Sequence, residues 1–349
     1  MKIAEAGFRV TGLPLRRKLR HAGTDTGELT EVFLRVRLAD GHVGWAETRG
    51  NGAYATGCST DTIVAALRTP GWQDTARLAR RCPPAAMLVD IASRDAAARA
   101  QGIPLWATLS DSPAPSSLPT HAAIAFGTET QAAHLADAAV RDGFGRIKIR
   151  IGGDPAVDRA RVTRVREVAG PSAVLAVDAN GGWDTGTALA AARWLADLDV
   201  AWFEQPVTDL ASMAVVRAGS PIPVWADESV RDAESVRAVA ELGAADGVHL
   251  KLEKAGTVDV LAAAIETARR HGLDVGLGQM DCGRLGCVTT AQLAAGLGVP
   301  VAELWGCANV ERDVTPGLEL RDGAVPLPAG PGLGLRPELD TTTPMRIDS

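Results

Sequence analysis

The chain has 349 residues, of which 46% are hydrophobic and 22% charged, and its formal net charge is −6. This composition is ordinary for a globular protein, and the length suits a barrel-sized domain with a smaller one. The interspersed charges argue against a nucleic-acid partner, and no stretch has the ~18 uninterrupted apolar residues of a membrane helix. Five scattered cysteines fit no metal-binding spacing, so we expect reduced thiols in a cytoplasmic protein without a signal peptide.

Residues 1–118 are expected to form an α+β domain. Apolar and polar residues alternate at residues 2–15 and 30–47, which predicts antiparallel strands joined by a hairpin turn. Residues 60–68 and 85–102 have the apolar period of helices. A linker rich in proline and serine then leads into the rest of the chain.

Residues 119–312 alternate short apolar strands with amphipathic helices. This alternation predicts an α/β fold with parallel strands, because each return to the sheet takes a helix. Eight units of roughly 25 residues favour a closed (β/α) barrel over an open sheet, whose glycine-rich phosphate turn does not follow the first strand. The expected strands are residues 120–127, 146–151, 173–180, 200–206, 223–229, 247–252, 273–279 and 300–306. The tail, residues 313–349, is expected to return to the first domain.

Charged residues end successive strands of this predicted barrel. Asp178, Glu204 and Asp227 each close one strand and Lys251 closes the next, about one β/α unit apart. The carboxyl ends of barrel strands form one rim, where active sites are built. A single Asp or Glu after a strand is more often a helix cap, but three in register are hard to obtain by accident. Their mutual repulsion calls for a cation, and all-oxygen ligands favour Mg²⁺ or Mn²⁺ over zinc.

The second predicted strand of the barrel directs two cations to one side. In "GRIKIRIGG", residues 145–153, Lys148 and Arg150 alternate with isoleucines. A strand enclosed on both faces would not point charges into an apolar core, so we expect these side chains to line a cavity that holds an anion and a metal. A lysine beside a metal and another cation has a lowered pKa and is a usable base.

With these motifs the chain resembles the enolase superfamily, and within it the muconate-lactonising subgroup of muconate cycloisomerases, o-succinylbenzoate synthases and dipeptide epimerases. The resemblance covers nearly the whole chain. It implies a modified TIM barrel of the (β/α)7β type, with residues 1–118 as a capping domain that residues 313–349 complete. It also implies a homo-oligomer that acts on a small-molecule carboxylate. The matching motifs are "KIR", "DANGGW", "FEQP", "ADES" and "LKLEKAGT" on strands two to six.

The resemblance also implies residue roles. Asp178, Glu204 and Asp227 would bind Mg²⁺, supported by Asn180 and Glu228. A base would remove the proton next to the substrate carboxylate and form a Mg-stabilised enediolate. Residues 13–24 and 44–57 resemble the two mobile cap loops of the family. The implied catalytic residues are Lys148, Arg150 and Lys251, and the expected substrate contacts are His21, Tyr54, Gln279, Asp281, Cys282 and Glu303.

Several positions depart from the family's pattern. Arg150 replaces the second lysine of the usual K-x-K, and arginine is a poor base because it stays protonated. Cys282 stands where a glutamate is common, and we interpret it chiefly as a buried thiol. Residues 303–307 lack the Asp-x-Asp pair that holds the substrate ammonium in dipeptide epimerases, so that activity is disfavoured. His249 is interpreted as a core histidine.

These features favour an isomerase, either an epimerase or a cycloisomerase, that acts on a small or N-substituted carboxylic acid. One alternative is a lyase or dehydratase, similar to o-succinylbenzoate synthase, that uses Lys251 as a single base for β-elimination. Another alternative, motivated by Arg150 and Cys282, is an inactive barrel that acts as a binding protein.

Overall fold

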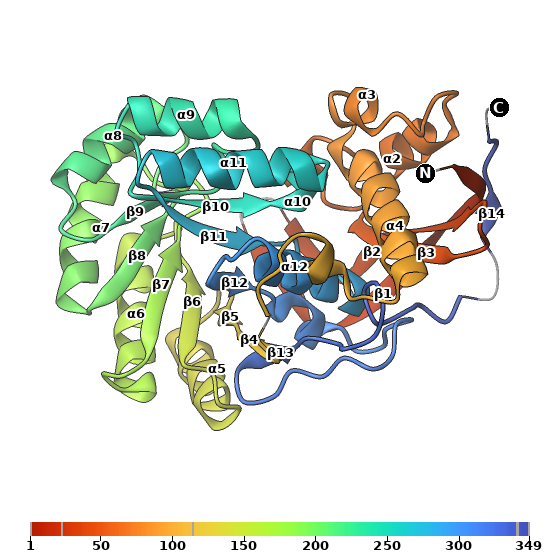
Figure 1. Cartoon of the computed structure of the whole chain (residues 1–349). Helices are drawn as coiled ribbons and strands as arrows, with labels where there is room; N and C mark the ends of the chain where they lie inside the picture. The colour runs from red at the N-terminus through yellow and green to blue at the C-terminus, as the bar shows by residue number, and fades with distance from the viewer. Residues whose placement is uncertain (1, 22–23, 114, 340–341, 348–349) are drawn as a thin grey trace.

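The computed structural model describes residues 2–21, 24–113, 115–339 and 342–347. Figure 1 shows two parts, an eight-stranded sheet wrapped by helices and a smaller antiparallel sheet with its own helices. The predicted α/β barrel with an α+β cap is thereby confirmed. Within the described ranges, no helix combines the length and apolar character required to cross a membrane.

Eight parallel strands make up the barrel sheet, and each overlaps a strand predicted from the sequence. They are β5 (Ala122–Ile124), β6 (Arg146–Arg150), β7 (Val174–Asp178), β8 (Val200–Glu204), β9 (Val224–Ala226), β10 (Gly247–Lys251), β11 (Asp274–Gly278) and β12 (Val301–Glu303). Their order in the sheet is the order of the chain. The two edge strands are joined through Thr120, whose hydroxyl donates to the Ala302 carbonyl (3.1 Å) and accepts from the Leu304 amide (2.8 Å).

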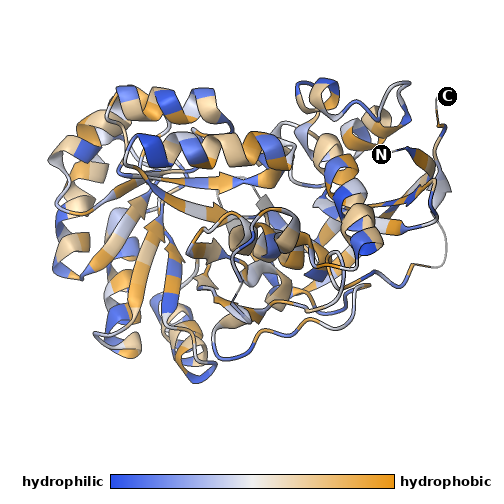
Figure 2. Cartoon of the chain, viewed as in Figure 1, coloured by the Kyte–Doolittle hydropathy of each residue, from blue (hydrophilic) through white to orange (hydrophobic). Residues whose placement is uncertain are grey.

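Helices connect each pair of consecutive barrel strands, which gives the (β/α)7β pattern. Side-chain caps define where several begin: Thr128 caps the first with a capping box, and Asp154 caps the second. Figure 2 shows mostly hydrophobic strands inside and helices with alternating hydrophobic and hydrophilic residues outside. The helices are α5 (Glu129–Arg141), α6 (Pro155–Ala169), α7 (Thr185–Asp197), α8 (Leu210–Gly219), α9 (Ala233–Glu241), α10 (Leu252–Ala255), α11 (Val258–Arg270) and α12 (Arg284–Gly296).

The capping sheet has the order β14–β1–β2–β3 and is antiparallel. Residues 13–21, expected to be a loop, instead continue β1, which pairs with β2 through an irregularity between Pro14 and Leu19. The ladder satisfies backbone groups that a loop would leave to water. The elements are β1 (Ile3–His21), β2 (Thr24–Leu38), β3 (Val43–Arg49), β14 (Thr343–Pro344), α1 (Ala53–Thr56), α2 (Thr60–Arg68), α3 (Thr75–Ala79), α4 (Pro83–Gln101) and the 3₁₀ segment η1 (Leu105–Thr108).

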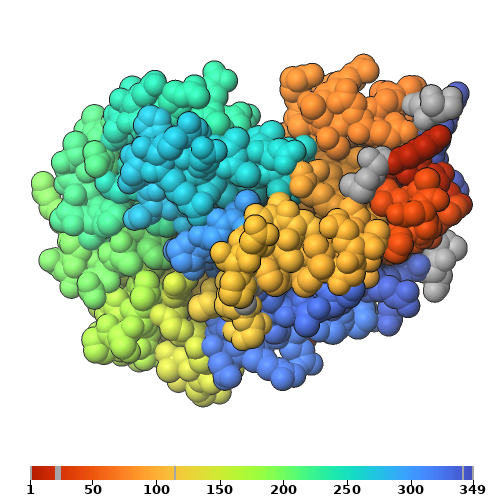
Figure 3. Space-filling model, in the orientation of Figure 1, coloured from red at the N-terminus to blue at the C-terminus, as the bar shows by residue number. Residues whose placement is uncertain are grey.

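The tail runs from the barrel back to the cap. After η2 (Trp305–Asn309), β13 (Ala324–Pro326) pairs with β4 (Ser117–Pro119), and β14 then pairs with β1. Figure 3 shows this segment at the surface, along the lower edge of the cap. These pairings agree with a tail that completes the cap, while the domain boundaries themselves stay a prediction.

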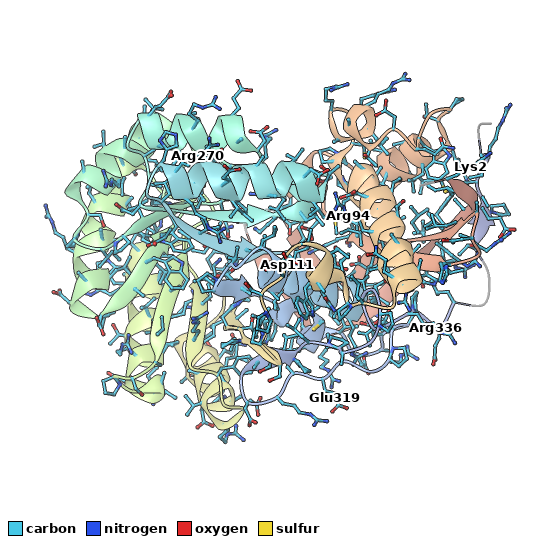
Figure 4. The ribbon with its side chains drawn as sticks, viewed as in Figure 1. Lys2, Arg94, Asp111, Arg270, Glu319 and Arg336 are labelled. Atoms are coloured by element: carbon cyan, nitrogen blue, oxygen red, sulfur yellow. The ribbon has the colours of Figure 1, made fainter. Side chains whose placement is uncertain are left out.

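Polar contacts join the cap to the barrel. The Glu47 carboxylate on β3 accepts hydrogen bonds from the backbone amides of Gly283 and Gly286, both at 2.8 Å, at the beginning of α12. A Cβ on Gly283 would lie 2.3 Å from the carboxylate, so this approach requires glycine. Arg94 of α4, labelled in Figure 4, pairs with Asp259 at the beginning of α11 (2.7 Å). These contacts hold the cap over the carboxyl ends of the barrel strands.

Candidate active site

A cavity lies between the carboxyl ends of the barrel strands and the cap. It encloses about 1130 Å³ of empty space, including its opening to solvent. The cap contributes residues of β1 and α1, and the barrel contributes the ends of its strands. Residues that line the cavity include Arg17, Lys18, Tyr54, His121, Arg150, Asn180, Asp227, Glu228, Lys251, Lys254, Gln279, Asp281, Glu303 and Trp305.

Strand register brings the predicted rim residues to one level. Arg150 is opposite Asp178, which is opposite Glu204. On the other side of the barrel, Lys251 is opposite Gly278, which is opposite Glu303. Neighbouring parallel strands therefore carry these side chains side by side into the same end of the barrel.

Lys148 lies at the floor of this arrangement, and only 4% of its surface is exposed. Its ammonium donates to both Glu204 oxygens (2.8 Å each) and to Glu303 Oε2 (2.7 Å), and lies 3.6 Å from Asp178 Oδ2. Burial alone would lower the pKa of Lys148, but Glu204, Glu303 and Asp178 outweigh it, so the pKa is raised. Lys148 therefore acts as a fixed positive charge in this structure.

Arg150 is one layer closer to the cap than Lys148. Its Nη1 pairs with Asp178 Oδ2 and donates to Asn180 Oδ1 (3.1 Å). Burial opposes the charge, but Asp178 and Glu204 raise the pKa of this guanidinium further. An arginine held in this way is a permanent cation at the cavity wall.

Lys251 and Lys254 both contact Asp227. The Lys251 ammonium pairs with Asp227 Oδ2, and Lys254 Nζ donates to Oδ1 at 2.6 Å. Burial would raise the pKa of Asp227, but the two lysines lower it. For Lys251, burial lowers the pKa while Asp227 and Glu228 raise it above its ordinary value. The structure thus places the predicted base in the cavity, paired with a predicted metal ligand.

The three predicted metal ligands are buried, but only two of them belong to the group of described residues whose ligand atoms could hold a metal ion together. Among the described residues, Glu204, Asp227 and His249 offer ligand atoms within 4.8 Å of one another. Asp178 forms an ion pair with Arg150 through Oδ2, and its Oδ1 accepts a hydrogen bond from the backbone amide of Asn180 (2.8 Å). His249 is a buried histidine as expected, but its Nδ1 lies 3.2 Å from Glu204 Oε1, at the site itself.

The donor set fits a hard divalent cation. Carboxylate oxygens dominate, as Mg²⁺ and Mn²⁺ require. Counted as ionised, six carboxylates face four cations around the inner cavity, which leaves two negative charges. The carboxylates are Asp178, Glu204, Asp227, Glu228, Asp281 and Glu303, and the cations are Lys148, Arg150, Lys251 and Lys254. Burial raises the pKa of Asp178 well above its usual range, an effect that a bound cation opposes.

Most of the predicted substrate contacts lie at the cavity. Tyr54, Gln279, Asp281 and Glu303 line it. Cys282 is not among the lining residues: it is 1% exposed and packs against the beginning of α12, so the structure does not support it as a contact. The side chain of the last candidate, His21, lies outside the described residues.

Sequence reasoning missed several cavity residues. Lys254 follows Lys251 by three positions, a spacing that puts both on one side of a helical turn and could have identified it. His121 directly precedes the first barrel strand, and burial lowers its pKa to about 4, so it is neutral near pH 7. No local pattern marks Arg17 or Trp305, because only the docking of the cap brings them together.

Comparisons with known proteins agree with this geometry. The family described as Enolase C-terminal domain-like matches residues 131–341. An aromatic dipeptide epimerase from Herpetosiphon aurantiacus is 33% identical over an alignment of 309 positions, which covers 82% of this chain and 84% of the relative. Muconate cycloisomerase 1 from Rhodococcus opacus is 28% identical over an alignment of 362 positions, gaps included, which covers 97% of each chain.

A solved structure shows the same architecture over the whole chain. The L-Ala-D/L-Glu epimerase from Bacillus subtilis, in a complex with substrate, superposes with a TM-score of 0.89 at 26% identity. The match covers 96% of this chain and 99% of that one. The family match, the relatives and the shared fold identify the same superfamily. The chain therefore belongs to the enolase superfamily of enzymes.

Proposed function

We propose that the protein is a divalent-metal-dependent isomerase that removes a proton from the carbon next to a substrate carboxylate and completes an epimerisation or cycloisomerisation. One observation carries the proposal: the Lys251 ammonium is in the cavity, beside the buried carboxylate of Asp227. The names of the relatives, dipeptide epimerases and muconate cycloisomerase, support an isomerase of a small carboxylate. Assembly as a homo-oligomer stays a prediction.

In this proposal Asp178, Glu204 and Asp227 hold Mg²⁺ or Mn²⁺. When bound, the cation supplies charge stabilisation for the carboxylate of the substrate as negative charge develops there. Lys148 and His249 contact the Glu204 carboxylate and orient it. Asn180 donates hydrogen bonds to both Asp178 and Glu228. These contacts restrict the carboxylates to one arrangement before any ligand arrives.

Lys251 is the acid/base group of the proposal. Asp227 and Glu228 raise its pKa in the structure, and burial lowers it. A divalent cation bound to these carboxylates would offset their charge. Burial would then be the main influence on the pKa of Lys251, and burial favours the uncharged amine that accepts a proton. Arg150 is four strands away in an eight-stranded barrel, so it faces the substrate from the opposite side.

Arg150 limits the reaction to one acid/base residue. A racemisation with two bases needs a group on each face that exchanges protons, and a permanent cation does not do so. This favours cycloisomerisation, in which one lysine handles the proton and Arg150 stabilises negative charge. The same observation supports a second candidate, a lyase that eliminates a β-substituent with Lys251 as its base.

Proton exchange tests the proposal. Wild-type protein and Lys251→Met are incubated in D₂O with Mg²⁺ and a panel of N-acyl amino acids and unsaturated diacids. We expect deuterium next to the carboxylate with the wild type, and a loss of about 10³-fold with the variant. Lys2→Met, at an exposed position, is the control. An unsaturated product with loss of a substituent identifies the lyase, and full exchange by Lys251→Met contradicts the role of this lysine.

A further inference from the structure

A buried histidine lies beside the predicted metal ligands. His249 precedes Lys251 by two positions on β10, so both side chains point to the same face of the strand, into the barrel. Val248 is opposite Ala226 in the ladder between β10 and β9, so His249 and Asp227 follow at the same level on neighbouring strands. Only 1% of the surface of His249 is exposed. The fold therefore places an imidazole next to a carboxylate that ends a barrel strand.

The group of donors that could share one ion contains this histidine. Glu204, Asp227 and His249 each offer one atom, and the three atoms lie within 4.8 Å of one another. Two ligands on opposite sides of a cation are about 4.2 Å apart when each bond is about 2.1 Å long, so the group needs little movement to bind a common ion. Asp178 is outside the group and forms its ion pair with Arg150. The arrangement therefore favours two carboxylates and one nitrogen as ligands.

Both ring nitrogens of His249 face carboxylate oxygens. Nδ1 lies 3.2 Å from Glu204 Oε1, and Nε2 lies 3.4 Å from Glu303 Oε2. Nε2 is buried and has no hydrogen-bond partner in the part of the chain that the structure describes. A neutral imidazole carries one N–H, so the lone pair of its other nitrogen faces an oxygen with nothing between them. A cation held by Nδ1 and Glu204 removes this repulsion and leaves an N–H on Nε2 for Glu303, which is the usual environment of a metal-bound histidine.

We propose that His249 is itself a metal ligand and that, with Glu204 and Asp227, it selects a divalent first-row transition metal such as Mn²⁺ or Co²⁺ over Mg²⁺. Mg²⁺ is a hard cation that takes oxygen ligands, whereas an imidazole nitrogen favours transition metals and binds Co²⁺ more tightly than Mn²⁺. Mg²⁺ still binds through the carboxylates, but less tightly. The inference rests on the proposed function, because it concerns the cation which that function requires. It changes the identity of the ion and leaves the role of Lys251 as it is.

Calorimetry tests the selectivity. MgCl₂ and CoCl₂ are titrated separately into EDTA-treated wild type, His249→Gln and His134→Gln. Glutamine offers an oxygen in place of the nitrogen, so His249→Gln should reduce the ratio of Co²⁺ affinity to Mg²⁺ affinity by about tenfold or more. His134 is exposed on α5, so His134→Gln should keep the wild-type ratio. The ratio separates the loss of a ligand from general damage to the fold, which would weaken both metals alike.

Pulsed EPR of bound Mn²⁺ tests the contact itself. A directly bound imidazole takes up electron spin density from the metal, so the wild type and His134→Gln should show a nitrogen coupling, and His249→Gln should bind Mn²⁺ without it. The proposal is overturned if the wild type shows no nitrogen coupling, if the affinity ratio is the same in His249→Gln as in the wild type, or if this variant weakens both metals equally. Each of these results would leave His249 as a partner of the two carboxylates alone.

These measurements separate this inference from the proposed function. Lys251-dependent proton exchange with Mg²⁺, without nitrogen coupling to bound Mn²⁺, would leave the proposed function in place and remove this inference. A nitrogen coupling that is lost in His249→Gln, without proton exchange on any probe when Mn²⁺ or Co²⁺ is supplied, would do the reverse.

Discussion

Arg150 lies opposite Asp178 in the ladder between β6 and β7, and their side chains form an ion pair at the rim of the barrel. The usual K-x-K would place a titratable amine at this position, whereas arginine keeps its proton. The pair therefore fixes a cation on the side of the cavity across from Lys251.

Arg150→Lys is expected to add a second acid/base group. An ammonium beside Asp178 is able to lose its proton, so both faces of the substrate carbon would then have an exchangeable group. We expect epimerisation of a chiral N-acyl amino acid in D₂O to appear or to rise at least tenfold, measured by chiral chromatography and NMR. Arg150→Gln, which cannot carry a proton, serves as the matched control. If both variants behave alike, position 150 does not exchange protons.

Mg²⁺ is expected to stabilise the folded protein. Burying three carboxylates together costs free energy that a divalent cation offsets, so the midpoint of thermal unfolding should rise with Mg²⁺ concentration and fall after EDTA treatment. Glu204→Gln should weaken Mg²⁺ binding at least tenfold by calorimetry. Glu241→Gln, at an exposed position on α9, is the control. Unchanged Mg²⁺ affinity in Glu204→Gln would exclude this carboxylate from the metal site.

Glu47 is expected to make stability depend on pH. Burial and the charge of Asp313 raise the pKa of Glu47 from 4.5 to about 8. Above pH 4.5 the unfolded chain releases a proton that the folded protein keeps, so this contribution to stability is complete below pH 4.5 and is lost as pH rises through about 8. Denaturant unfolding between pH 5 and 8.5 should show a steeper loss of stability in the wild type than in Glu47→Gln. Parallel curves for the two proteins would contradict the assignment.

Arg49 is expected to position Tyr54, in residues 50–57, which we expect to act as a lid over the cavity. Its guanidinium carbon lies 5.6 Å from the centre of the Tyr54 ring, and its Nε donates to Asn51 Oδ1 at 3.1 Å. Arg49→Met should loosen residues 50–57, with faster amide hydrogen exchange there and a KM raised about tenfold, because a lid must be ordered to exclude water. Arg35→Met, on the neighbouring strand, is the control. Exchange at residues 50–57 that matches the wild type would show that Arg49 does not order the lid.

Local patterns predicted the strands of the barrel and the charged residues that end them. Residues 174–178 and 200–204 show why: a short apolar run that ends in a carboxylate specifies both a buried strand and a polar residue at its carboxyl end. The position of these carboxylates in the fold is then nearly fixed, because every parallel strand of a barrel presents its carboxyl end at the same rim. Asp178, Glu204, Asp227 and Lys251 were therefore recognisable from the sequence alone.

The tertiary structure decided which residues surround these groups. Cys282 lies close in sequence to Gln279, yet the former packs against α12 and the latter lines the cavity. His249 reaches Glu204 only because Gly278, on the next strand, leaves room: a Cβ there would lie 2.4 Å from His249 Nε2. Arg17 meets Trp305 only after the cap has docked. Because such contacts depend on packing between different elements, no periodicity within one element encodes them.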